Sequence, residues 1–351
     1  MQKLAETLNA IRPLYQEAVC AAQARHAQLT KPMGSLGCLE EISVRLAGIQ
    51  GTVRPDVSQK AVFVMAGDHG VARESVSAYP QEVTAQMVDN FLQGGAAINV
   101  LARHAGARVK VADMGVASNL EPHPELVVRK INYGTRNIAR GPAMSQAEVL
   151  EAVKAGIEVF EAEYKKGLQL AATGDMGIGN TTPSAALLAV FTGLPAAEVA
   201  GRGTGVDDKQ FANKVNAIEQ ALAVNQPDPC DPISALAKVG GFEIAGLVGV
   251  ILAGAAHRVP VVIDGFISGA AALVATALAP QAKDFLFAGH QSVEPGHQAM
   301  LAHMGLKPIL NLDLRLGEGT GAVLAMQLIE AAAKILNEMA TFDEAGVSEA
   351  S

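Results

Sequence analysis

Short runs rich in apolar residues are the feature of this 351-residue chain that most restricts its fold. From residue 60 onward they alternate with longer stretches of helical periodicity. Because apolar and polar residues do not alternate within these runs, each run predicts a strand that is buried on both faces, as in a parallel sheet flanked by helices. The predicted strands span residues 61–66, 109–114, 168–173, 259–264 and 285–288.

The stretches between the runs carry the three- and four-residue spacing of buried helices. The predicted helices span residues 81–104, 146–166, 183–192, 208–223, 241–257, 267–279 and 295–304, and a last helix spans 321–339. This order of elements predicts the α/β class, with a parallel sheet covered by helices.

The first 58 residues have a different pattern. Residues 2–28 predict one long helix that Pro13 kinks or splits. A turn-rich string at 31–37 and a second helix through Leu46 follow, and the composition of 51–58 is that of a linker. We therefore expect a helical segment over 1–58, an α/β catalytic domain over 59–320, and a C-terminal helix with a mobile tail over 321–351.

Composition and charge argue against several classes of protein. The formal net charge of -8 leaves no excess of basic residues to neutralise nucleic-acid phosphates. No apolar run reaches the ~20 residues that a membrane-spanning helix needs, and the amphipathic start is not typical of a signal peptide. Cys20, Cys38 and Cys230 form no CxxC pair, so we expect a reduced, cytoplasmic protein without a disulfide framework.

Polar, glycine-rich turns follow the predicted strands. In an open parallel sheet, ligands bind beyond the carboxyl ends of the strands. We therefore expect these turns to form one rim that carries several carboxylates. The turns lie at 67–70, 113–115, 174–183, 264–266 and 289–292, and the loop 317–321 opens the last helix.

The string at 174–183, GDMGIGNTTP, allows two interpretations. Its glycines permit close backbone approach, and Pro183 suits the first turn of a helix that Asn180 or Thr181 could cap. Free N–H groups at such a helix start can bind a phosphate. The alternative is an ordinary connection between a strand and a helix. Lys214 could supply a cation for the same phosphate, or it could be a surface lysine.

Glu318 stands between two glycines at the start of the last helix. The helix dipole would lower its pKa and burial would raise it. If burial dominates, Glu318 is suited to act as a general base near neutral pH, and otherwise it is a capping carboxylate. His69 is interpreted as a polar rim residue that is hydrogen-bonded near its strand end. The chain has no H-x-x-H or H-E-x-x-H arrangement, so neither a metal nor a cofactor is expected.

Eight strings, taken together and in this order, resemble one known family. They lie at 31–37 (KPMGSLG), 67–70 (GDHG), 79–87 (YPQEVTAQM), 94–102 (GGAAINVLA), 177–183 (GIGNTTP), 238–242 (KVGGF), 264–266 (DGF) and 315–321 (RLGEGTG). They are similar to the strings of the nicotinate-nucleotide–dimethylbenzimidazole phosphoribosyltransferases of cobalamin synthesis. The resemblance covers nearly the whole chain.

This resemblance implies a large Rossmann-like domain and a small helical domain built from the N-terminal segment and the end of the chain. It also implies a homodimer that acts on small-molecule substrates. The implied reaction converts nicotinate mononucleotide and 5,6-dimethylbenzimidazole to α-ribazole 5′-phosphate and nicotinate.

The resemblance also implies roles for particular residues. The family's catalytic base falls on Glu318. Its second site carboxylate, usually a glutamate, falls on Asp175, which is one methylene shorter and is expected to stabilise the developing positive charge on the ribose. The nucleotide contacts fall on Gly177, Ile178, Gly179, Asn180, Thr181, Lys214 and Ser292, and the aromatic-base pocket falls on Tyr79, Pro80, Gln81, Met87 and Leu316.

Three alternatives remain open from the sequence. The acceptor could be adenine, another benzimidazole or a phenol, because pocket shape discriminates by only ~1–3 kcal/mol per methylene. The chain could also bind a nucleotide without catalysis. An NAD-dependent oxidoreductase is suggested by fold analogy alone, and the first predicted strand is not followed by G-x-G-x-x-G.

Overall fold

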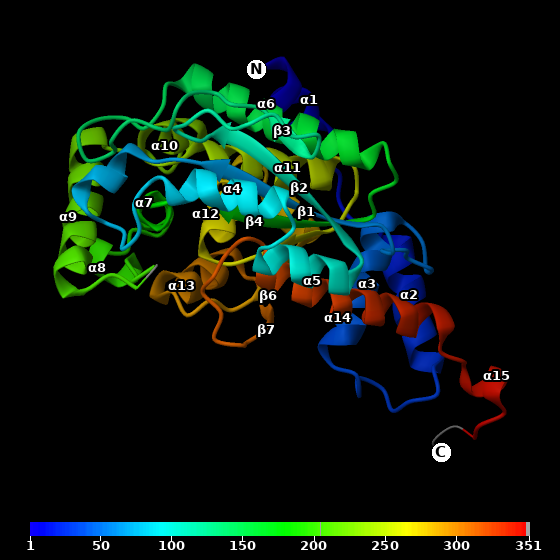
Figure 1. The fold of residues 1–351 in the computed structure, drawn as a ribbon. Coiled ribbons are helices and arrows are strands. Elements are labelled where there is room, and N and C mark those ends of the chain that lie inside the picture. The colour runs from blue at the N-terminus through cyan, green and yellow to red at the C-terminus, as the bar shows by residue number, and fades with distance from the viewer. Residues whose placement is uncertain (204, 349–351) are drawn as a thin grey trace.

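A single parallel sheet of seven strands forms the centre of the molecule (Figure 1). The computed structural model describes residues 1–203 and 205–348. Across the sheet the strand order is β3-β2-β1-β4-β5-β6-β7, and every neighbouring pair is parallel. The strands are β1 Lys60–Gly67, β2 Ala107–Gly115, β3 Leu126–Val128, β4 Leu170–Met176, β5 Val261–Ile263, β6 Leu286–His290 and β7 Pro308–Leu310. The α/β class predicted from the sequence is confirmed.

The central strands are those with long apolar runs. All eight residues of β1 are buried, and Lys60 of β1 is paired with Ala107 on one side and with Leu170 on the other. The two edge strands, β3 and β7, were not predicted. Each has only three residues and is partly exposed. Three residues are too few to show the pattern of a strand that is buried on both faces.

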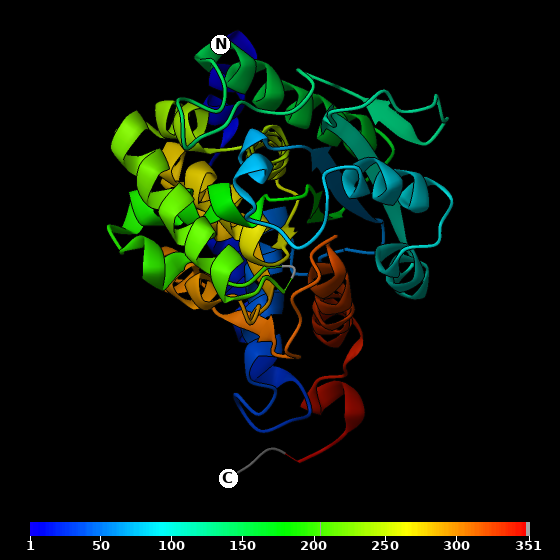
Figure 2. The same cartoon turned by 60° about the vertical axis from the view of Figure 1, so that its left-hand side comes forward.

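Helices cover both faces of the sheet (Figure 1). Helices α6 (Gln146–Tyr164) and α11 (Phe242–Ala256) lie on one side, and α5 (Ala97–Ala105) and α14 (Thr320–Glu338) lie on the other. Figure 2 shows a further group of helices packed beside the sheet. The remaining elements of this part are α4 Val83–Leu92, α7 Thr181–Thr192, α8 Ala196–Val199, α9 Asp208–Asn225, α10 Pro232–Val239, α12 Phe266–Leu278 and α13 Pro295–Met304, with 3-10 turns η1 Gly70–Glu74 and η2 Pro280–Phe285. Within the described residues, no helix is both long and apolar enough to span a membrane.

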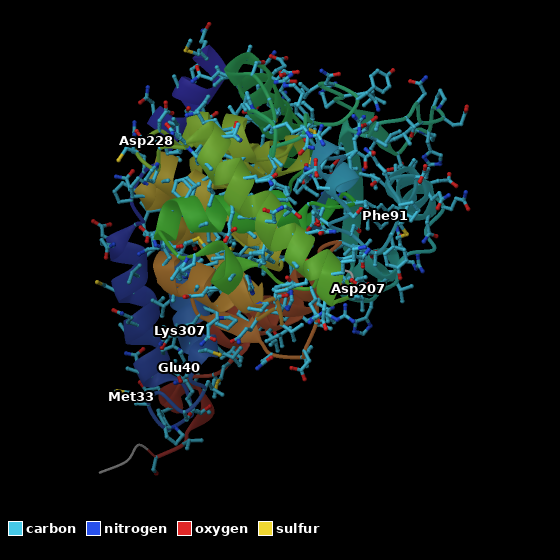
Figure 3. The ribbon with its side chains drawn as sticks, turned by 90° about the vertical axis from the view of Figure 1, so that its left-hand side faces the viewer. Met33, Glu40, Phe91, Asp207, Asp228 and Lys307 are labelled. Carbon is cyan, nitrogen blue, oxygen red and sulfur yellow. The ribbon has the colours of Figure 1, made fainter. Side chains whose placement is uncertain are left out.

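The N-terminal segment forms three helices: α1 Gln2–Ala10, α2 Gln16–Gln28 and α3 Cys38–Gln50. The predicted break at Pro13 is confirmed, because α1 ends and α2 begins on either side of it. Helix α1 packs against α6 and α11, whereas α2 and α3 pack with α14 in a small bundle. Figure 3 places Met33 and Glu40 at the end of the molecule that holds this bundle.

The segment predicted as a mobile tail begins in contact with the connection between α2 and α3. Thr30 donates its N–H to the carbonyl of Ala340 at 3.1 Å, and Thr341 forms an isolated antiparallel bridge with Leu29. A last turn of helix, α15, spans Phe342–Ala345. The last residues of the chain, 349–351, lie outside the described residues.

The predicted helix over 81–104 is two helices. Gly94, with a φ of +77°, ends α4, and the Asn99 side chain accepts a hydrogen bond from the Ala96 N–H at the start of α5. A left-handed glycine is a common way to end a helix. The break turns the N-terminus of α5 toward the loop at 317–319, so that the Ile98 N–H can donate to Glu318.

Close contact between α6 and α11 supplies a test of the packing. A Cβ atom added to Gly156 would lie 1.9 Å from the carbonyl oxygen of Gly246, so the two backbones meet without room for a methyl group. We expect Gly156→Ala to destabilise the fold by about 1–3 kcal/mol through overpacking. Urea denaturation measures this change. Gly141→Ala is the control, because nothing lies within 4 Å of its added Cβ, and equal midpoints for the two variants would contradict the prediction.

Candidate active site

The sheet has one topological switch point, between β1 and β4. The chain proceeds from β1 to β2 and β3 on one side, and from β4 to β5, β6 and β7 on the other. Parallel sheets bind ligands in the crevice outside the strand ends at such a point. A cleft of about 500 Å³ opens there, between the turns that follow β4 and β6, the start of α4 and the loop before α14.

The cleft brings most of the predicted site residues together. Its walls include Tyr79, Met87, Asp175, Gly177, Ile178, Asn180, Thr181, Ser292, Leu316 and Glu318. Four predicted residues do not line it: Pro80, Gln81, Gly179 and Lys214. Several lining residues had been given no individual role, among them Gly203, Phe266, His290, Glu294 and Arg315. Most of these lie in or beside the turns that the sequence placed on the rim.

Glu318 lies on an unusual loop, which we call the base loop (Gly317–Glu318–Gly319). Its three residues have φ values of +84°, +61° and +93°. Two of them are glycines, which adopt this region freely, but a glutamate held there stores roughly 1–3 kcal/mol of strain. A Cβ on Gly174 of β4 would lie 2.4 Å from the Glu318 carbonyl oxygen, so the loop rests directly on the strand.

The carboxylate of Asp264, directly after β5, holds the base loop in place. Its Oδ2 accepts the N–H of Gly319 at 3.1 Å, and its Oδ1 accepts the N–H of Ala322 at 2.9 Å. Both donors lie at the start of α14, where N–H groups have no partner within the helix. Asp264 is fully buried and thus caps α14 from a neighbouring strand. The sequence placed Asp264 on the rim but did not indicate this role.

The Glu318 side chain is buried beside the cleft, with 5% of its surface exposed. Its Oε2 accepts the N–H of Ile98 at 3.2 Å, from the first turn of α5. Burial raises the pKa of Glu318 above its usual range, the Ile98 hydrogen bond opposes that change, and the charge of Asp264 adds to it. Of the two effects weighed from the sequence, burial dominates, so a buried carboxylate with a raised pKa faces the cleft.

Asp175, near the end of β4, is a second buried acid. Its Oδ2 accepts a hydrogen bond from Asn180 Nδ2 at 2.9 Å. Burial raises the pKa of Asp175 well above its usual range, and the charges of Asp264 and Glu243 raise it further. This shift favours the neutral acid over the carboxylate.

Lys214 on α9 lies behind one wall of the cleft and is only 1% exposed. The alternative of a surface lysine is therefore wrong. Its Nζ donates to Thr181 Oγ1 at 2.8 Å and to the carbonyl of Gly201 at 2.9 Å. Burial lowers the pKa of Lys214 to about 8. Its charge reaches the cleft through Thr181 and Gly203, both of which line it.

The start of α7 faces the same region. Asn180 precedes the helix, and Ile178 donates its N–H to Thr84 Oγ1 at 3.1 Å, which fixes the turn against α4. The first N–H groups of a helix favour an anion. The turn at 177–181 thus combines a helix start with a buried cation behind it.

The opposite part of the cleft is apolar. Tyr79 and Leu316 stand at its mouth with 55% and 58% of their surfaces exposed. Met87 and Phe266 line it further in. A flat aromatic ligand would find wall atoms here rather than hydrogen-bonding groups.

His69 lies beneath the cleft rather than on its rim. Its ring is 1% exposed, and its Nε2 lies 2.8 Å from Glu243 Oε1. A Cβ on Gly177 would approach that nitrogen to 3.3 Å, so the histidine supports the turn from below. Its predicted hydrogen bond near the strand end is present, but its ring is buried and does not line the cleft as a rim residue would.

These features define the class of protein. A cleft at the switch point of a parallel sheet, with a helix start on one side and a buried carboxylate beside an apolar wall on the other, is typical of an α/β enzyme that acts on a small molecule. Comparison with known proteins then identifies the family. The chain matches the family described as "Phosphoribosyltransferase" over residues 11–347, and it belongs to that family.

Individual relatives are similar over their full length. A protein of Desulforudis audaxviator named nicotinate-nucleotide–dimethylbenzimidazole phosphoribosyltransferase is 59% identical over 350 residues, covering 100% of this chain and 99% of the relative. A protein of the same name from Geobacter sulfurreducens is 58% identical over 349 residues, covering 99% of each chain. The crystal structure of CobT from Thermus thermophilus superposes with a TM-score of 0.92 at 52% identity, covering 95% of this chain and 100% of that one.

The buried acid at 175 supplies a test of the site's electrostatics. When the pKa of an acid is higher in the folded chain than in the unfolded chain, the free energy of unfolding falls as the pH rises. The reason is that the unfolded chain ionises near pH ~4 while the folded chain resists ionisation. We expect Asp175→Asn to be more stable than the parent at pH 8, by on the order of 1 kcal/mol, and this advantage to shrink toward pH 4. Denaturation at both pH values measures it. Asp89→Asn, on the exposed surface of α4, should show no such change with pH.

Proposed function

We propose that this chain transfers the 5-phosphoribosyl group of nicotinate mononucleotide to 5,6-dimethylbenzimidazole, giving α-ribazole 5′-phosphate and nicotinate. The observation that carries the proposal is the position of Glu318, a buried base with a raised pKa between an anion-binding turn and an apolar wall. The names of the full-length relatives support the choice of substrates.

The chemistry needs a base at one point. The leaving nicotinate is a pyridinium in the substrate, so it departs with the bonding electron pair and needs no proton. The benzimidazole attacks the anomeric carbon through one ring nitrogen, and the N–H on its other nitrogen becomes acidic as positive charge develops. Glu318 accepts that proton, a transfer that typically contributes about 10²–10⁴-fold. Attack opposite the leaving group converts the β bond to an α bond.

In this proposal the two substrates occupy opposite parts of the cleft. The phosphate and ribose lie against Gly177, Ile178, Asn180 and Thr181, with Ser292 beside them and Lys214 behind, and the aromatic base lies against Tyr79, Met87 and Leu316. Gly179 gives the turn its shape, with a φ of +88°. Pro80 and Gln81 shape the entry to α4 rather than touch the ligand. Holding two planar bases and a ribose in line adds several kcal/mol, up to about 7–11 in well-oriented systems.

In this proposal Asp175 acts as a neutral acid rather than as the charged group expected from the sequence. As a neutral acid it can donate a hydrogen bond to a ribose hydroxyl or to the incoming base, and it adds no negative charge next to Glu318. Two ionised carboxylates at this depth would repel each other, so one neutral partner keeps the other available as the base.

The acceptor is the less constrained substrate. The apolar wall can also take adenine, another benzimidazole or a phenol, because it discriminates by shape alone. Competition between these acceptors for one nucleotide, with products identified by mass, ranks them. Nucleotide binding without catalysis is disfavoured by the strained loop that presents Glu318, since a binding protein has no need of a buried base held at this cost.

We also propose that the chain acts as a homodimer in the cytoplasm. Cys20, Cys38 and Cys230 are free and exposed, which suits a reducing compartment. Large apolar side chains are exposed around the cleft, including Tyr79, Val293, Leu312 and Leu316, and a second subunit would cover such a surface.

Removing the proton acceptor is the central test. The parent should release nicotinate from nicotinate mononucleotide only when a benzimidazole is present. Glu318→Gln should keep the fold, because an amide oxygen can still accept the Ile98 N–H, but should lower kcat by about 10²–10⁴-fold. Turnover within a few-fold of the parent would remove Glu318 from the role of base.

The buried lysine predicts a second kinetic change. Lys214→Met keeps the side-chain volume but removes the charge, so we expect KM for nicotinate mononucleotide to rise about 10-fold or more and KM for the benzimidazole to stay near the parent value. In the parent, kcat/KM for the nucleotide should fall as the pH rises through about 8, where Lys214 loses its proton, and the variant should lack that fall. Lys209→Met, on the exposed surface of the same helix, is the control. Equal effects on both substrates would contradict a phosphate role.

A further inference from the structure

Two buried histidines lie behind the cleft. His290 ends β6, and His297 lies in the first turn of α13. Their rings are 6.1 Å apart between centroids and tilted by 42°, and they are 2% and 0% exposed. His290 lines the cleft, whereas His297 does not. The proposed reaction uses neither ring.

Nδ1 of His297 accepts a hydrogen bond. Ser292 donates its backbone N–H to His297 Nδ1 at 2.9 Å, so Nδ1 must carry a lone pair. Burial, with the neighbouring His290, lowers the pKa of His297 to about 3, which keeps the ring neutral. A neutral imidazole with a lone pair on Nδ1 carries its proton on Nε2. Nε2–H of His297 is therefore a hydrogen-bond donor.

Nε2 of His290 lies beside Asp264. It is 3.6 Å from Asp264 Oδ1, the atom that also accepts the Ala322 N–H at 2.9 Å. An N–H at Nε2 is the favourable arrangement beside a carboxylate. The other ring nitrogen, Nδ1, is then left for a different partner.

One nitrogen of each ring is left without a partner. His297 Nε2 and His290 Nδ1 are both buried, and neither has a hydrogen-bond partner among the described residues. Ser268 Oγ, on α12, is also buried without a partner there. A buried polar group without a partner is unfavourable. One oxygen atom between the two rings would supply a partner to both nitrogens.

We infer that His297 is a positioning residue, whose Nε2–H donates to one bridging oxygen that also bonds His290 Nδ1. The observed parts of this relay are the hydrogen bond from the Ser292 N–H to His297, the contact of His290 with Asp264 at 3.6 Å, and the hydrogen bonds from Gly319 and Ala322 to Asp264. The relay joins the turn assigned to the nucleotide to the base loop that carries Glu318. The inference rests on the proposed function for its meaning in catalysis.

A matched pair of variants tests the two links separately. In His297→Asn an amide oxygen can take the place of Nδ1 and accept the Ser292 N–H, but no donor reaches His290. We expect kcat to fall about 10-fold to 100-fold, because the base loop is no longer held in position. KM for nicotinate mononucleotide should stay close to the parent value. In His297→Gln an amide N–H can take the place of Nε2, but Ser292 loses its acceptor. That variant should raise KM for the nucleotide.

His303→Asn is the control, because it makes the same change at an exposed position on the same helix. Thermal denaturation separates a loss of stability from a displacement of the base loop. An Asn variant that folds and turns over as fast as the parent would overturn the inference. So would an Asn and a Gln variant with the same split between KM and kcat, since a merely structural histidine would move both constants alike.

A measurement on the parent alone decides the hydrogen-bond directions. Nitrogen-15 NMR of the histidine rings should show His297 as the neutral tautomer protonated at Nε2, without titration between pH 5 and 8. A proton on Nδ1, or titration in that range, would refute the relay even if every variant failed to fold. If the parent releases no nicotinate, the proposed function fails, and the NMR result still stands for or against the relay.

Discussion

The site depends on one buried carboxylate that is held by backbone N–H groups. Asp264 meets the first turn of α14 and accepts the N–H groups of Gly319 and Ala322 at 3.1 and 2.9 Å. The contact satisfies both partners: the first N–H groups of a helix have no acceptor within the helix, and a buried carboxylate needs hydrogen-bond donors. The same contact holds Glu318 in a left-handed conformation that the chain would not adopt alone. The geometry of the cleft follows from it.

The acids of the cleft are affected by burial rather than by ion pairing. Asp175, Asp264 and Glu318 are all buried, and each has a pKa raised by its loss of water. At such depth the acids cannot ionise independently, so hydrogen bonds decide which of them keeps its proton. Asp264 receives backbone N–H groups from α14, and Glu318 receives one from α5. The ends of these helices therefore distribute the negative charge of the site.

Local patterns predicted much of this molecule and missed the parts that arise from distant contacts. The β1 run could be recognised because all its residues are buried, whereas β3 and β7 are three-residue edges that only their neighbours make into strands. Glycines on both sides of Glu318 indicated a ligand site. The role of Asp264 could not be predicted, because its partners lie 55 and 58 residues further along the chain. The depth of Lys214 was missed for the same reason, since the Gly201 carbonyl and Thr181 that bind it come from outside its own helix.

Helix α14 reaches from the cleft to the small bundle. Its first turn carries the base loop, and near its other end Leu336 packs against Ala22 and Ala47 of the small bundle, while Arg25 donates to the Leu336 carbonyl at 2.8 Å. The helix has 19 residues, so it is a rigid rod about 28 Å long. The packing of the small bundle and the placement of Glu318 therefore share one rigid element, so a substitution that shifts one end of this helix acts on both.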